Sequence, residues 1–125
     1  MILYLPSEKE LNDRLLRIIS TVAGEAGLEV IRLLEELKVR LLNQSRDVAV
    51  TVIYVESYIA LTEILPLSDR LGAMRVALIF PDEQPDLLEK ARLLRPHLIL
   101  AMEEDFIYLN TTLKRMTELF RMISR

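Results

Sequence analysis

The chain has 125 residues, a formal net charge of −3 and a hydrophobic content of 51%. A chain of this length and composition is typical of one globular domain and not of a disordered protein. The slightly acidic balance gives no electrostatic footprint for nucleic acid or for an anionic membrane.

The first predicted strand is Ile2–Leu5, which ends at Pro6. The following Ser7-Glu-Lys-Glu10 has the form of a capping box and predicts the start of a helix. Gly24 and Gly27 predict its end. Its apolar residues recur at helical spacing, which is typical of a helix that packs one face on a sheet: Leu11, Leu15, Ile18, Ile19 and Val22.

Leu28–Ile31 predicts a short second strand at an edge, and Leu33–Leu42 predicts a second helix. A polar turn at Asn43–Arg46 leads into Asp47–Val55, which is rich in β-branched residues. This stretch is apolar on both faces and therefore predicts a central strand that is buried on both sides.

Tyr58–Gly72 has a helical pattern, but Pro66 lies inside it and predicts a kink or two short pieces, because proline removes an amide donor. The remaining segments predict a buried strand, a helix, a last strand and a long closing helix: Arg75–Phe80, Pro85–Leu94, His97–Ala101 and Asp105–Ile123.

Five strands thus alternate with five helices along a single domain that spans residues 1–125. Connections between parallel strands are almost always right-handed crossovers, which leaves few topologies. The pattern predicts an α/β fold, a three-layer doubly wound sandwich whose five-stranded parallel sheet has the order 2-1-3-4-5. Another small α/β sandwich, such as an anti-sigma-antagonist-like domain, is the alternative.

The layout resembles a response-regulator receiver domain over essentially the full chain. The resemblance rests on the length, the five strand-helix units, the Gly27-Leu-Glu-Val30 entry to strand two and the amphipathic closing helix. The family requires two acidic residues after strand one, an acceptor Asp at the end of strand three, a Thr or Ser after strand four and a Lys after strand five. Its Mg²⁺ neutralises charge on the transferring phosphoryl group.

This sequence departs from the family at every one of those positions. Strand one is followed by Pro6-Ser7, with only Glu8 beyond. The acceptor position falls between Val52 and Tyr54, and there is no Asp between positions 47 and 69. Strand four ends at Phe80-Pro81, and no Lys occurs between positions 90 and 114. The resemblance therefore implies a degenerate pseudo-receiver without aspartyl-phosphate chemistry, in which Tyr54 and Phe80 fill the vacated pocket as core.

Acidic residues remain at the predicted strand ends, and hard divalent cations prefer oxygen ligands. Glu56 with Asp82 is the best candidate pair for a metal site. The alternative is that these acids stabilise the positive ends of helix dipoles and cap free amides. The whole set is Glu8, Glu56, Asp82, Glu83, Glu103, Glu104 and Asp105.

The sequence gives little support to catalytic, cofactor-binding or nucleic-acid-binding functions of other kinds. The absence of Cys excludes disulfides and thiol catalysis, and it is compatible with a cytoplasmic protein. His97 starts the last strand, away from the usual ligand crevice, so we expect it to be structural or solvent-facing. There is no glycine-rich phosphate loop, no basic patch interleaved with aromatic residues, and no apolar run near the roughly 20 residues of a transmembrane helix. We expect no cofactor, no nucleic acid or membrane partner, and no enzymatic activity.

In receivers, the usual partner surface is formed by helix four, strand five and helix five. By analogy, we expect an interaction surface, and a homodimer, at Leu94, Arg95, Met102, Tyr108, Thr112 and Arg115. The sequence thus favours a phosphorylation-independent interaction or signalling module. The alternative is a divalent-metal-dependent enzyme or ligand-binding domain that uses the acidic strand ends.

Overall fold

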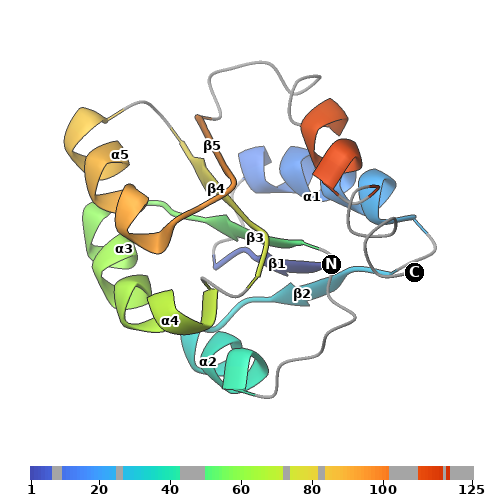
Figure 1. Cartoon of the computed structure of the whole chain (residues 1–125). Coiled ribbons are helices and arrows are strands. Elements are labelled where there is room, and N and C mark those ends of the chain that lie inside the picture. The colour runs from blue at the N-terminus through green and yellow to red at the C-terminus, as the bar shows by residue number, and fades with distance from the viewer. Residues whose placement is uncertain are drawn as a thin grey trace.

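Five parallel strands form a single sheet in the order β2-β1-β3-β4-β5 (Figure 1). The computed structural model describes residues 1–6, 10–24, 27–42, 50–71, 74–81, 84–101, 110–116 and 118. The strands are β1 (Ile2–Tyr4), β2 (Glu29–Ile31), β3 (Thr51–Tyr54), β4 (Val76–Phe80) and β5 (Leu98–Ala101). This order confirms the predicted doubly wound sheet and excludes the alternative sandwich. As predicted, β2 lies at an edge.

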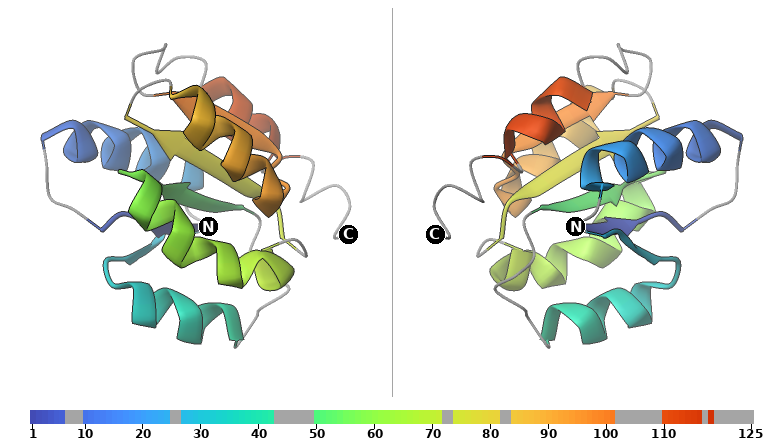
Figure 2. Two further views of the ribbon diagram at one scale, coloured as in Figure 1. Left: turned by 90° about the vertical axis from the view of Figure 1, so that its left-hand side faces the viewer. Right: turned by 90° about the vertical axis from the view of Figure 1, so that its right-hand side faces the viewer.

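Helices cover both faces of the sheet (Figures 1 and 2). α1 (Glu10–Ala23) and the helical residues 110–116 cover one face. The other face carries the remaining helices: α2 (Leu34–Leu42), α3 (Tyr58–Ile64), α4 (Ser68–Leu71) and α5 (Pro85–Ala91). The result is the three-layer sandwich that the alternation of strands and helices predicts.

The hydrophobic core is divided by the sheet into two clusters. β3 contributes to both, because successive side chains of a strand point to opposite faces. Ile53 and Val55 pack in the cluster under α2–α5, whereas Val52 and Tyr54 pack in the cluster under α1. All four β3 residues are buried, which confirms the prediction of a central strand without a wet face.

The predicted helix over Tyr58–Gly72 is divided into three pieces. α3 ends at Ile64, a 3₁₀ turn at Leu65–Leu67 contains Pro66, and α4 follows. Proline has no amide hydrogen to continue the helical bonding, so the chain tightens there as predicted. Glycine likewise ends α1, since Gly24 and Gly27 have positive φ angles of 54° and 87°.

Some predicted features lie outside the described residues, among them Ser7 of the capping box, the Asn43–Arg46 turn and much of the closing helix. The described part of that helix is tied to the start of β4, because Arg75 Nη1 donates to the carbonyl of Met116 at 3.1 Å. Among the described residues, no helix is long and apolar enough to cross a membrane.

Candidate functional site

The C-terminal ends of the parallel strands meet along one edge of the sheet. The register pairs Tyr4 with Ile53, Tyr54 with Ile79, and Phe80 with Ala101. The strand order changes direction between β1 and β3, because the connection from β1 leads outward to β2 and the later connections lead toward β5. In open α/β sheets, ligands bind in the crevice at such a switch point.

The end of β3 is closed by apolar side chains. Val52, Ile53, Tyr54 and Val55 are all buried, so the positions predicted for the phosphoacceptor belong to the core. Tyr54 and Phe80 are also buried, as predicted. They lie on opposite faces of the sheet, however, so they do not fill one common pocket.

Glu56 is the first charged residue beyond β3, and it stands two residues past the end of that strand. Its side chain is half-buried, and its Oε1 atom is buried without a hydrogen-bond partner among the described residues. The next residue, Ser57, is used locally: its Oγ accepts from the Ala60 amide at 3.2 Å and caps α3. The carboxylate is thus the one described acid placed at the switch point.

Two further residues at this edge were not singled out from the sequence. Burial raises the pKa of Tyr4 above its ordinary value, and the negative charges of Glu63 and then Glu56 raise it further. Arg32, directly after β2, donates from Nη1 to the carbonyl of Leu5 at 3.2 Å. The predicted strand order already placed both residues at this edge, because Tyr4 ends β1, Arg32 follows β2, and both strands end on the same side of the sheet as β3.

The predicted metal pair is only half described. Asp82 lies outside the described residues, and Glu56 is the only member of the predicted acidic set inside them. Within the described ranges, no three His, Cys, Asp or Glu side chains are grouped to hold a metal ion. What the described edge offers chemically is a phenol, Tyr4, under the influence of two carboxylates, Glu63 and Glu56, and a guanidinium, Arg32, that is bound to the Leu5 carbonyl.

His97 lies at the opposite end of the sheet, directly before β5. Its amide donates to the carbonyl of Val76 at 2.8 Å, and its Nδ1 accepts from the Val76 amide at 3.4 Å. These bonds align β5 beside β4, which is the structural one of the two predicted roles.

The predicted interaction residues do not all reach the surface. Leu94 is fully buried and belongs to the core, so its assignment to the surface was wrong. It shares the inward stripe of Leu87 and Ala91, a spacing of four and then three residues that the sequence already contains. The neighbouring Leu93 is 64% exposed instead.

The other predicted interaction residues have three different outcomes. Arg95 is exposed and adopts a left-handed conformation, with a φ of 51°. Thr112 is half-buried and Arg115 is exposed on the closing helix. Met102 and Tyr108 lie outside the described residues.

Comparison with solved structures identifies the class of fold. The chain is similar to the signal receiver domain of an HD domain-containing protein from Pseudomonas fluorescens Pf-5, with a TM-score of 0.75 and 17% identity, over 98% of this chain and 90% of that one. It is also similar to a pilus assembly-related protein from Burkholderia pseudomallei K96243, with a TM-score of 0.66 and 17% identity, over 94% and 87% of the two chains. No family model and no curated protein matches the sequence. The chain therefore has a receiver-like, flavodoxin-like fold.

Proposed function

We propose that this chain is a cytoplasmic signalling module that binds other proteins through a receiver-like fold, independently of phosphorylation and without catalysis. The observation that carries the proposal is the end of β3. Where the resemblance to receivers requires an acceptor Asp, the chain has buried Val52, Ile53 and Tyr54, and no Asp occurs between positions 47 and 69.

The other positions of the aspartyl-phosphate switch support the same proposal. Pro6 follows β1 in place of the metal-binding acids, and Pro81 follows β4 in place of the hydroxyl. Proline offers neither an oxygen ligand nor a side-chain donor. The sequence also has no Lys between positions 90 and 114 to neutralise a phosphoryl group after β5.

The proposed interface is the side of the sheet at β5, with self-association as the first form of binding. Leu93, Arg95, Thr112 and Arg115 are the described residues that we assign to it. Support comes from the exposure of Leu93 and Arg95, and from the position of β5 at the end of the described sheet.

A second candidate function is a divalent-cation site that involves Glu56 and Asp82. It is favoured by the buried Oε1 of Glu56, which has no hydrogen-bond partner among the described residues. A buried carboxylate oxygen of this kind is costly unless it meets a donor or a cation. A Glu56→Ala, Asp82→Ala double variant that binds metal as well as the parent would exclude this function.

The deciding experiment is a thermal-shift titration with Mg²⁺ alone and then with Mg²⁺ plus beryllofluoride, a mimic of the bound phosphoryl group. Ligands that bind only the folded state raise the melting temperature. The proposal expects no rise with either. A rise with Mg²⁺ alone that is lost in the double variant supports the cation site, and a further rise with beryllofluoride overturns the phosphorylation-independent function.

A further inference from the structure

The open side of β2 offers backbone groups to a further strand. No described strand pairs with β2 on the side away from β1. The Glu29 amide donates to the carbonyl of Met1, and the Ile31 carbonyl accepts from the amide of Leu5, so both residues bond toward β1. Because the backbone groups of successive strand residues point to opposite sides, Val30 presents its amide and its carbonyl outward.

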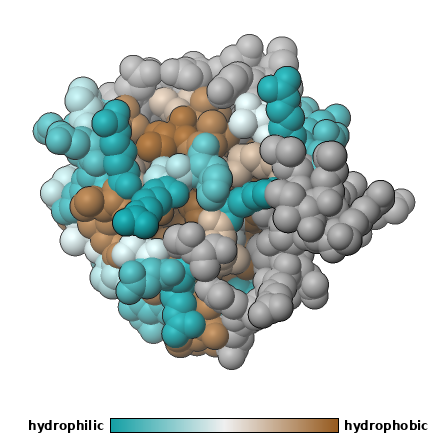
Figure 3. Space-filling model, in the orientation of Figure 1, coloured by the Kyte–Doolittle hydropathy of each residue, from teal (hydrophilic) through white to brown (hydrophobic). Residues whose placement is uncertain are grey.

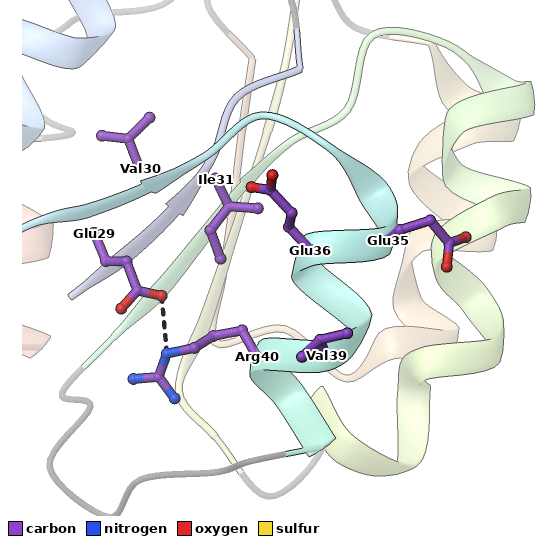
Figure 4. Close-up of a pocket in the computed structure, with 7 residues that line it drawn as sticks. All are labelled: Glu29, Val30, Ile31, Glu35, Glu36, Val39 and Arg40. Carbon is purple, nitrogen blue, oxygen red and sulfur yellow. Dashed lines mark hydrogen bonds and ion pairs between the residues drawn. The ribbon is translucent and has the colours of Figure 1, made fainter.

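A groove of about 480 Å³ lies between this edge and α2 (Figure 4). Val39 of α2 supplies exposed apolar surface, whereas Ile31 of β2 also lines the groove but is almost fully buried. An ion pair of 2.8 Å from Arg40 Nε to Glu29 links the two elements. In the close-up, Glu36 extends from α2 toward β2. A strand added beside β2 would direct every second side chain into this groove.

Apolar side chains are exposed around the groove. Val39 is 56% exposed, and Figure 3 shows hydrophobic and hydrophilic side chains together over α2, at the lower end of the view. Of the seven large hydrophobic residues that are exposed in the described chain, four belong to β2, α2 or the link between them. They are Val30, Leu33, Val39 and Leu42. Exposed apolar surface concentrated at one place marks an interaction site.

The charge of the groove selects the kind of occupant. The charged residues that line it are Glu29, Glu35, Glu36 and Arg40, so its lining is acidic even with Arg40 bound to Glu29. Lys38 pairs with Glu35 at 3.3 Å but does not line the groove. Two copies that paired through β2 would bring the same acidic rims together, which is unfavourable, whereas a basic partner complements them.

We infer that the groove between β2 and α2 binds an extended segment of a partner protein. Every second residue of the segment faces the groove, and these groove-facing residues alternate between apolar side chains and Lys or Arg. The segment pairs with the outer backbone groups of Val30 and extends the sheet by one strand. Its groove-facing apolar side chains contact Val39, and its groove-facing cations lie against Glu29 and Glu36. This surface is on the opposite edge of the sheet from β5, so it is tested separately from the interface proposed above.

The test is a titration of ¹⁵N-labelled protein with a blocked peptide about eight residues long, as in an ordinary strand. In this peptide every second residue is alternately Val and Lys, and the residues between them are Thr. We expect amide shifts centred on Glu29–Ile31 and on Val39, with an affinity that falls as salt is raised. The same peptide with Glu in place of Lys should bind about tenfold more weakly or worse. Equal binding of both peptides, shifts confined to other elements, or concentration-dependent shifts at β2 without peptide would each overturn the inference.

Two variants test the groove itself. Glu36→Lys reverses an exposed rim charge and should weaken the lysine peptide about tenfold. Val39→Arg places a cation at an exposed position where arginine is a good helix former, so the fold should persist while binding is lost. Glu89→Lys, at an exposed position of α5, is the matched control and should bind as the parent does. If Val39→Arg retains full affinity, the groove is not the site.

Discussion

At the scale of single residues, the switch-point edge is governed by an acid beside a phenol. Glu56 follows β3 and has one buried carboxylate oxygen, and the nearby Tyr4 is buried in the core. Burial and two carboxylates act on Tyr4 in the same direction, because each disfavours the phenolate and so raises the pKa. The ionisation of Tyr4 therefore reports the charge of this edge.

Tyr4 should make the folded state sensitive to alkali. Because its pKa is raised in the folded protein, the unfolded tyrosine releases its proton first, and stability is lost as pH rises from the ordinary tyrosine pKa of about 10 toward the folded value. Tyr4→Phe should remove this part of the loss, measured by urea unfolding at several alkaline pH values. Alkaline curves that coincide for parent and variant would contradict it.

The two carboxylates should contribute unequally to the pKa of Tyr4. Glu63→Gln should lower it more than Glu56→Gln does, since Glu63 is the larger of the two charge effects. Glu89→Gln, on α5, is the control and should leave it unchanged. The measurement is a spectrophotometric titration of tyrosine ionisation. A larger effect of Glu56→Gln on the pKa of Tyr4 would contradict this order of the two carboxylates.

At the scale of elements, α3 depends on its first residues more than a long helix would. It has seven residues and runs directly into the 3₁₀ turn that contains Pro66. Short helices are marginal by themselves and need tertiary packing and caps. Leu61 and Ile64 supply the packing, and Ser57 supplies the cap.

Ser57→Ala should lower the free energy of unfolding by about 1 kcal/mol, because the Ala60 amide loses its acceptor. Ser57→Asp should restore most of the loss, since Asp is an equally good cap. The check is urea unfolding of both variants beside Ser20→Ala, a control on the exposed side of α1. Equal effects of Ser57→Ala and Ser57→Asp would show that the cap is not what stabilises α3.

At the scale of the whole molecule, the described sheet has two ends of different character. The β2 end is acidic and grooved, whereas Arg95 and Arg115 are exposed among the residues that we assign to the β5 interface. Because the two proposed surfaces lie at opposite ends of the described sheet, occupation of one leaves the other accessible. The sheet order separates them, with β1, β3 and β4 lying between.

Two leucines of nearly equal exposure allow the two edges to be tested separately. Leu93 and Leu33 are exposed to nearly the same extent, 64% and 61%, near β5 and β2 respectively. Leu93→Asp should weaken self-association about tenfold or more, because it buries a charge in the proposed interface, whereas Leu33→Asp should not. Sedimentation equilibrium measures both. Weakening by Leu33→Asp alone would place the contact between copies at the β2 edge.

Much of the fold, and the lack of a phosphoacceptor Asp at the end of β3, can be predicted from the sequence. Apolar runs such as Arg75–Phe80, which lies between Gly72 and Pro81, are local signals of a buried strand. Right-handed connections then leave few ways to order the strands. The absence of an Asp between positions 47 and 69 is likewise a property of the chain itself. These inferences succeed because they depend on neighbours in sequence and on general rules of chirality.

The tertiary structure alone decided which side chains meet. It placed Tyr54 and Phe80 on opposite faces of the sheet, and it set Glu56 and Glu63 near Tyr4. It also formed the groove beside β2 from two elements that are each unremarkable in sequence. The reason is physical: burial, charge effects and grooves arise from distances between segments far apart in the chain, and no local pattern encodes those distances.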